Sequence, residues 1–145
     1  MSWDRVGRRL SRALPPFGPA LVVVLGLLVL SCRSPHRGLW RGSFDGTVSG
    51  EMEFRISSWG AKLEGSMQGR TREGSPFEAD LEGKMRGEAF YARIEGSARG
   101  GVLPVAFEGL MRGELGGERG GGDWQVEIKL TREPMAGRWQ ASRVE

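Results

Sequence analysis

The chain has 145 residues, of which 21 are Lys or Arg and 18 are Asp or Glu, so its formal net charge is +3. Four of the basic and one of the acidic side chains precede Cys32, which leaves 17 of each sign in residues 32–145. This balance excludes the basic surface expected of a nucleic-acid-binding protein. The single cysteine excludes a disulfide framework and a thiolate metal cluster.

Residues 1–31 have the organisation of a secretory signal peptide. Four arginines precede the apolar run 20–30, which is followed by Ser31-Cys32, and this order of positive, apolar and small residues is typical of an export signal. An apolar run of eleven residues rises only about 16 Å as a helix, whereas the bilayer hydrocarbon is roughly 30 Å thick. We therefore expect export; the alternatives are an uncleaved signal anchor and twin-arginine export through Arg8-Arg9.

The residues around the expected cleavage site indicate a lipid anchor. Val29-Leu30-Ser31-Cys32 resembles the lipobox of bacterial lipoproteins, which implies that the Cys32 thiol receives a diacylglycerol and becomes the first mature residue. Residues 32–37 would then tether the protein to a membrane of the cell envelope. In enterobacterial lipoproteins an aspartate after the cysteine favours retention in the inner membrane, so Arg33 implies the outer membrane by the same resemblance.

From residue 38 to residue 145, apolar residues and glycines alternate with charged residues. Between Val48 and Ile56, for example, the apolar positions and Gly50 share one parity while the glutamates between them share the other. A period of two with one apolar and one charged face is typical of an antiparallel strand that is half exposed to water. All but three of the 24 glycines follow Cys32, and they fall in phase with the apolar residues.

Turn-forming residues divide this region into eight predicted strands. The clearest turn signals are Asp45-Gly46, Ser58-Trp59-Gly60, Gly87-Glu88, Gly100-Gly101 and the flexible loop 116–122. The sequence therefore predicts an all-β fold, an antiparallel up-and-down meander that forms a small closed or nearly closed β-barrel. The predicted strands are 38–45, 47–57, 61–71, 76–86, 89–99, 102–113, 123–132 and 136–144.

Residues 77–113 contain one sequence unit three times, at 77–87, 90–100 and 103–113. The thirteen-residue spacing equals one strand plus a tight turn. A two-residue type II′ turn at Gly87-Glu88 would pair Leu81 with Ile94 and Gly83 with Ala92. The same rule at Gly100-Gly101 would pair Ile94 with Phe107, Ala92 with Gly109 and Arg93 with Glu108.

These registers predict that rows of large apolar side chains alternate with rows of glycine and alanine inside a small barrel. An inner row Leu81–Ile94–Phe107 would lie next to a row Gly83–Ala92–Gly109, which suits an interior too narrow for large side chains at every level. A row Glu82–Arg93–Glu108 would lie outside. Pro104 conflicts with this register because it cannot donate a ladder hydrogen bond. Either loop 100–103 is longer and Pro104 begins its strand, or a bulge intervenes.

The two ends of the predicted barrel share a further pattern. Gly38-Leu39-Trp40 opens the first strand, and the last strand carries Gly137-Arg138-Trp139 and ends near Arg143. This is similar to the lipocalin and wider calycin pattern, in which a basic residue of the final strand packs over the tryptophan of the first. The resemblance implies a barrel that accepts an apolar ligand. Tryptophans that fill the ends of any β-fold would give the same pattern.

We expect no catalytic, cofactor or metal site. His36 is the only histidine and lies in the tether, which removes imidazole catalysis and a histidine metal cluster. The lysines lie on predicted outward faces, which leaves no partner for a serine nucleophile. The carboxylates that could form a hydrolytic pair also lie on the outer face. These carboxylates are Glu51, Glu53, Glu78, Asp80, Glu82 and Glu95.

Two functional hypotheses remain. In the first, a lipid-anchored, non-catalytic envelope protein binds an apolar small molecule or a partner protein, with a cavity lined by Trp40, Phe54, Leu81, Phe107 and Trp124. In the second, the core is filled and the barrel is a structural or interaction module. Trp59, in a predicted turn, either contacts a partner or folds back over the barrel end.

Overall fold

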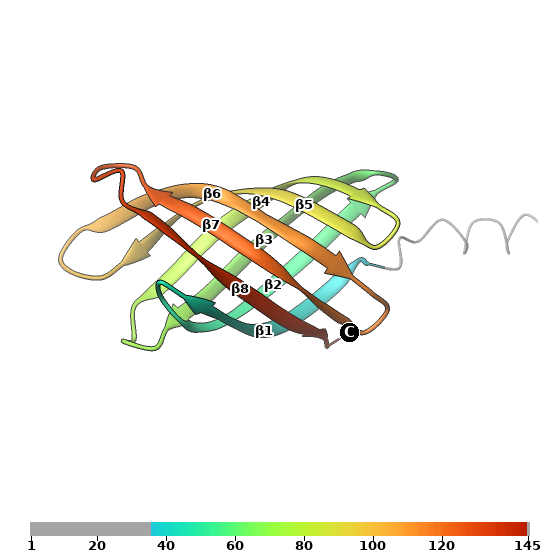
Figure 1. The fold of residues 1–145 in the computed structure, drawn as a ribbon, viewed down its shortest axis with the longest axis horizontal. Coiled ribbons are helices and arrows are strands. Elements are labelled where there is room, and N and C mark those ends of the chain that lie inside the picture. Colours follow the sequence, from blue (N-terminus) through green and yellow to red (C-terminus); the bar gives the residue numbers. More distant parts are fainter. Residues whose placement is uncertain (1–35, 145) are drawn as a thin grey trace, which may run out of the picture. The chain divides into compact units, whose positions relative to one another are not determined.

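The computed structural model describes residues 36–144, without the side chains of Ser58 and Trp59. This part of the chain is all-β (Figure 1), and it contains no helix long and apolar enough to cross a membrane. The eight strands are β1 (Gly38–Gly46), β2 (Gly50–Trp59), β3 (Lys62–Thr71), β4 (Pro76–Arg86), β5 (Ala89–Arg99), β6 (Pro104–Leu115), β7 (Arg119–Ile128) and β8 (Pro134–Arg143).

The strands form a closed, antiparallel, up-and-down barrel, as the sequence predicted. Each strand pairs with the next along the chain, and β1 pairs with β8 to close the barrel. Every strand therefore has both of its hydrogen-bonding partners within the compact unit Ser34–Glu145. Because closure removes both sheet edges, this unit has the contacts that it needs to fold by itself.

The β4–β5 hairpin has the predicted register. Leu81 pairs with Ile94 and Gly83 with Ala92. Gly87 has a φ of 61° and Glu88 has a negative φ, which is the conformation of a type II′ turn with glycine first. The inner and outer faces also follow the predicted parity, since Leu81, Ala92 and Ile94 are buried.

The predicted register of the next hairpin is wrong by two residues. Ile94 pairs with Gly109, and Phe107 pairs with Gly96. The cause is Pro104, which begins β6 opposite Arg99 after the four-residue loop 100–103, as the longer-loop alternative required. At the strand end its missing N–H interrupts no interior ladder bond.

The outer face changes with this register. Arg93 lies opposite Leu110 rather than Glu108, and the carboxylates of Glu95 and Glu108 become direct cross-strand neighbours. In the predicted row Glu82–Arg93–Glu108, the pairing of Glu82 with Arg93 is confirmed, and the pairing of Arg93 with Glu108 is wrong. Lys129 and Arg93 both reach these two carboxylates, which offsets the repulsion expected between like charges on neighbouring strands.

The glycine-rich segment expected to be a flexible loop is partly a strand. The turn between β6 and β7 covers only residues 116–118, and Gly120, Gly121 and Gly122 belong to β7. A side chain has no room at the inner positions. A Cβ on Gly122 would overlap the carbonyl oxygen of Arg112, and one on Gly120 would lie 2.5 Å from Leu115 Cδ2.

Two tryptophans explain these inner glycines. Trp139 on β8 pairs with Gly122 on β7, and its indole Nε1 donates a hydrogen bond of 3.0 Å to the carbonyl oxygen of Arg112 on β6. The indole therefore crosses the inner face of β7. Trp124 on β7 does the same over Gly137 on β8, donating to the carbonyl oxygen of Asp45 on β1 at 3.1 Å. Indole rings thus occupy the space that the glycines leave.

The interior aromatics form one group at each end of the barrel. At the end where β1 begins, Phe54 contacts Trp40 and Trp139, and Phe90 contacts Trp139. At the other end the ring contacts join Phe44 to Phe77 and Trp124, and Phe77 to Phe107. The first group packs in a filled core, whereas the second group surrounds an empty apolar space, which is the candidate site.

Candidate ligand site at one end of the barrel

One end of the barrel interior contains an apolar cavity of about 110 Å³. It lies where the loops 47–49, 72–75, 100–103 and 129–133 connect the strands, at the left of Figure 1. Its aromatic wall comes from alternating positions of five strands, which the pleat directs inward. These aromatic side chains are Phe44, Phe77, Phe107, Trp124 and Trp139, of which Trp139 also contacts Phe54 and Phe90 in the aromatic group of the opposite end.

The cavity wall offers almost nothing to a polar ligand. Thr71 is the single polar residue among those that line it. The indole N–H groups of Trp124 and Trp139 are already bonded to backbone carbonyl oxygens. Apolar walls of this kind accept apolar guests; an enclosed engineered cavity of about 150 Å³ binds benzene.

The opposite end of the interior is filled. Trp40, Leu63 and Leu115 are fully buried there, and Trp40 stacks on Phe54 with 6.2 Å between ring centroids. The indole N–H of Trp40 donates to the carbonyl oxygen of His36 at 3.1 Å. His36, which we expected to belong to the tether, is itself buried. This end of the barrel is therefore a solid core.

Arg143 lies at the filled end, opposite Trp40 in the β1–β8 register. Its guanidinium donates a hydrogen bond of 2.6 Å to the carbonyl oxygen of Arg37. The pairing brings together the first-strand tryptophan and the last-strand arginine that the sequence pattern placed near each other. The hydrogen bond from Arg143 also links the end of β8 to the residue that precedes β1.

The five residues expected to line a cavity divide between the two ends. Phe107 and Trp124 line the cavity. Trp40, Phe54 and Leu81 are buried but are not among its lining residues. Sequence reasoning missed Phe44, Phe77 and four methionines. Two features of the sequence could have indicated these residues. They occupy inward-facing positions close to the loops of one barrel end, and methionine has a flexible side chain that packs loosely.

Two of the residues singled out from the sequence, Cys32 and the side chain of Trp59, lie outside the part of the chain that the structure describes. Cys32, the expected lipidation site, lies outside residues 36–144. Trp59 is the last residue of β2, paired with Lys62, and its side chain is outside the description. The expected turn at 58–60 is wrong, because the turn is Gly60-Ala61 with φ of 60° at Gly60.

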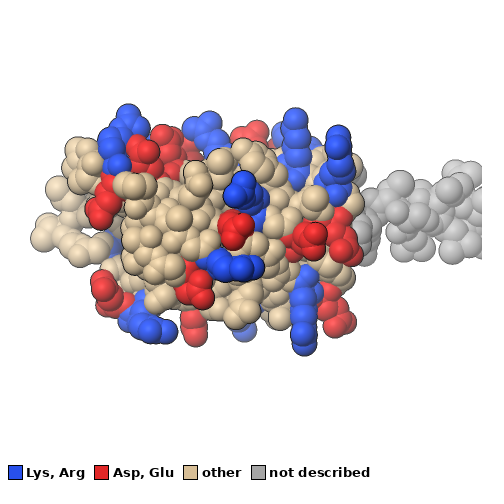
Figure 2. Space-filling model, in the orientation of Figure 1, with Lys and Arg blue, Asp and Glu red and all other residues tan. Residues whose placement is uncertain are grey.

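The charged residues lie on the outer face, with both signs dispersed (Figure 2). The carboxylates considered for hydrolysis point outward: Glu53 is half-buried, and Glu51, Glu78, Asp80, Glu82 and Glu95 are exposed. Lys62, Lys84 and Lys129 are exposed as well, as expected. Alternation therefore separates the charged side chains from the apolar interior.

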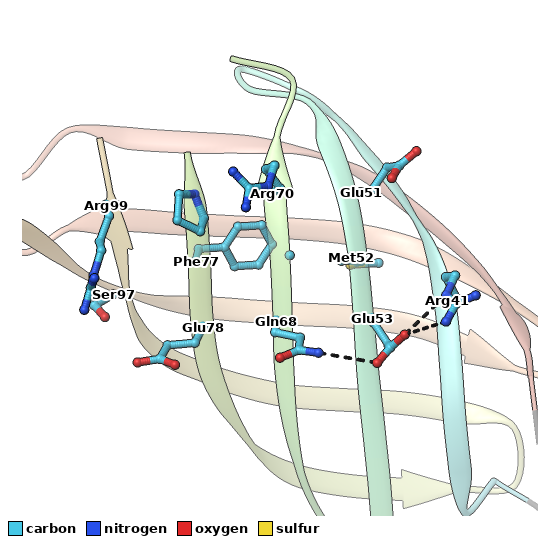
Figure 3. A pocket seen from close by; sticks show the side chains of 12 residues that line it. Arg41, Glu51, Met52, Glu53, Gln68, Arg70, Phe77, Glu78, Ser97 and Arg99 are labelled. Carbon is cyan, nitrogen blue, oxygen red and sulfur yellow. Dashed lines mark hydrogen bonds and ion pairs between the residues drawn. The ribbon is translucent and has the colours of Figure 1, made fainter. Parts of the chain in front are cut away.

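The outer face also carries a shallow groove across β1 to β5 (Figure 3). Glu53 is the centre of its polar network. It accepts hydrogen bonds from Arg41 at 2.9 and 3.2 Å and from Gln68 at 3.4 Å. Because Arg70 and Arg99 on the same groove are matched by Glu51 and Glu78, the groove presents no excess of one charge.

The clearest electrostatic coupling is between Glu95 and Lys129. Their side chains are 2.7 Å apart, and this hydrogen bond is the main cause that lowers the pKa of Glu95 and raises the pKa of Lys129. The two directions agree. Both side chains are exposed, so solvent and salt screen the interaction.

Comparisons with known proteins give no family. No protein-family model matches the chain, and no curated protein matches it. Within residues 36–144, no group of three or more His, Cys, Asp or Glu side chains is placed to hold a metal ion. The apolar cavity is therefore the feature from which a function can be argued.

Proposed function

We propose that this protein is a lipid-anchored, non-catalytic protein of the cell envelope whose barrel binds an apolar small molecule. The observation that supports the proposal is the cavity of about 110 Å³ with an apolar wall at one barrel end. Burial of hydrocarbon in such a site is favourable by about 25 cal/mol per Å² of apolar surface removed from water. The cavity wall provides no charged side chain to hold a charged head group, and Thr71 is its single polar residue.

The size of the cavity limits the ligand. Pockets that enclose a whole drug-sized molecule measure about 300–1,000 Å³, so a volume of about 110 Å³ holds only a small apolar group. The ligand class that fits is a molecule with a slim hydrocarbon end, such as an alkyl chain. The remainder of the molecule would emerge between the loops 47–49, 72–75, 100–103 and 129–133.

The anchor and the location are supported by the sequence. The export signal of residues 1–31 and the lipobox-like Val29-Leu30-Ser31-Cys32 favour lipidation of Cys32, and Arg33 favours the outer membrane. The pairing of Trp40 with Arg143 supports the calycin-like part of the proposal, because calycin barrels commonly accept apolar ligands.

A second candidate function is a structural or interaction module of the envelope without a ligand. The filled end around Trp40 and the small volume of the cavity favour it. In this alternative the cavity is a packing defect, and partners would contact loops such as the one that follows Trp59.

Isothermal titration calorimetry with decanoic acid separates the two. We expect residues 34–145 to bind one equivalent and the variant Ala98→Phe to lose binding at least about tenfold, because Ala98 lines the cavity and the ring would fill it. The matched control is Ala106→Phe, which adds the same ring at an exposed outer position. Absence of binding to the unmodified domain, or equal losses in both variants, would support the structural module instead.

A further inference from the structure

Methionine side chains are concentrated around the cavity. Residues 36–144 contain five methionines, and four of them line the cavity: Met52, Met67, Met111 and Met135. The fifth, Met85, is buried elsewhere in the interior. The single cysteine of the chain lies before residue 36, so the sulfur groups of the described residues are thioethers. Oxidation of a thioether to a sulfoxide converts an apolar side chain into a polar one.

Met135 differs from the other four methionines in its exposure to solvent. Met52, Met67, Met85 and Met111 expose between 1% and 7% of their surface, whereas Met135 is half-buried. A dissolved oxidant must contact the sulfur atom in order to react with it. Met135 is therefore the methionine of the cavity wall that such an oxidant reaches most easily.

The exposure of Met135 follows from the register of the barrel. Met135 is the second residue of β8 and pairs with β7. On the other side, β1 pairs with β8 as far as Gly137, and the hydrogen bonds of Thr47 continue this contact to Ala136. Met135 lies one residue beyond, so β7 is its one strand neighbour in the described part of the chain. It therefore lies at the mouth of the cavity, next to loop 129–133.

A hydroperoxide oxidises a thioether by transferring an oxygen atom to the sulfur. The O–O bond breaks and an S–O bond forms; the sulfur is oxidised, and the peroxide is reduced to water or an alcohol. The cavity wall offers the new oxygen few partners, because Thr71 is its single polar residue and the indole N–H groups of Trp124 and Trp139 already donate to backbone carbonyl oxygens. The sulfoxide oxygen therefore needs water at the cavity mouth, which interrupts the apolar wall.

We propose that Met135 is a site of oxidation by hydroperoxides and that its sulfoxide releases the apolar ligand. The second part rests on the proposed binding of an apolar molecule in the cavity. A bound alkyl chain covers the Met135 side chain, so the occupied barrel is oxidised more slowly than the empty barrel. The sulfoxide removes apolar surface that the chain would cover, so the oxidised barrel binds the chain more weakly.

Peptide mass spectrometry of residues 34–145 treated with hydrogen peroxide tests the site. We expect Met135 to gain oxygen at least about tenfold faster than the four buried methionines. Saturating decanoic acid should slow the oxidation of Met135 severalfold. Met85 is the matched control, because it lies outside the cavity wall and its rate should not change with decanoic acid. Equal rates at Met135 and at the buried methionines would overturn the proposal.

Calorimetry with decanoic acid tests the release. After oxidation, the unmodified domain should bind decanoic acid at least about tenfold more weakly, because a polar group has entered an apolar site. Met135→Leu removes the sulfur and nearly conserves the volume, so its affinity should survive the same treatment. The matched control Met85→Leu retains Met135 and should lose affinity on oxidation as the unmodified domain does. Circular dichroism verifies that each protein remains folded after treatment.

The outcomes separate the oxidation site from the ligand site. Oxidation of Met135 that leaves the affinity for decanoic acid unchanged would contradict the release, as would an equal loss of affinity in oxidised Met135→Leu. If the untreated domain does not bind decanoic acid, the proposed ligand site is wrong and the release is wrong with it. Preferential oxidation of Met135 would in that case still establish the oxidation site.

Discussion

Trp139 and Gly122 are cross-strand partners, and the indole of Trp139 crosses this glycine to bond the carbonyl oxygen of Arg112 on the strand beyond. The position of the indole ring and the absence of a side chain at Gly122 depend on each other. A Cβ on Gly122 would overlap the oxygen that the indole N–H satisfies. Trp124 and Gly137 repeat the arrangement across β8. Glycine and tryptophan are therefore complementary parts of one narrow barrel wall.

Gly122→Ala should destabilise the barrel. The methyl group would overlap the backbone of Arg112, and overpacking of this kind costs about 1–3 kcal/mol, occasionally more. Urea unfolding measures the change in the free energy of unfolding. Gly101→Ala is the matched control, because a Cβ there meets no atom within 4 Å; it should stay within about 0.5 kcal/mol. Equal effects of the two changes would contradict the packing described here.

Trp139→Phe should destabilise the barrel for a different reason. The ring remains apolar, but the carbonyl oxygen of Arg112 loses its indole donor, and a hydrogen bond of this kind contributes about 0.5–1.5 kcal/mol to stability. The same urea unfolding gives the value. In the unmodified protein, the indole N–H signals of Trp40, Trp124 and Trp139 should exchange slowly with solvent. Fast exchange at Trp139 would contradict the hydrogen bond.

Lys129→Ala should raise the pKa of Glu95, because the Lys129 ammonium holds that pKa below its ordinary value of 4.5. A depressed carboxyl pKa contributes stability that is present above pH 4.5 and is lost as the pH falls through the folded value. Carboxyl carbon chemical shifts followed through pH 2–7 by NMR measure the change. Lys84→Ala, at another exposed outer position, should leave Glu95 unaffected. High salt should reduce the difference between the two variants.

The sequence predicted the barrel because period-two alternation determines which side chains face inward, whatever the register. It also predicted the β4–β5 register, since a two-residue turn at Gly87-Glu88 leaves one pairing. It failed in the register of the next hairpin, where Gly100-Gly101 suggested a two-residue turn, although Pro104 already indicated the longer loop as an alternative. Local patterns do not show that Trp139 on the neighbouring strand leaves no room for a side chain at Gly122, so residues 119–122 at the start of this strand were taken for part of a loop.

The candidate site was predicted only in part, for a related reason. Parity places Trp40 and Trp124 inside equally well, but it does not show which end of the barrel is filled. The difference arises from packing: Trp40 stacks on Phe54 in the solid end, whereas Phe107 and Trp124 lie in the wall of the cavity. The exposure of Met135 likewise depends on the point at which β1 stops pairing with β8.

Methyl NMR of methionine tests the central claim most directly. Met52, Met67, Met111 and Met135 line the cavity, whereas Met85 is buried elsewhere in the interior. Titration of ¹³C-methyl-methionine-labelled residues 34–145 with decanoic acid should shift the first four signals together with one saturation curve and leave Met85 in place. Shifts of Met85 equal to the others, or no shift at saturating decanoic acid, would contradict an apolar binding site at this end of the barrel.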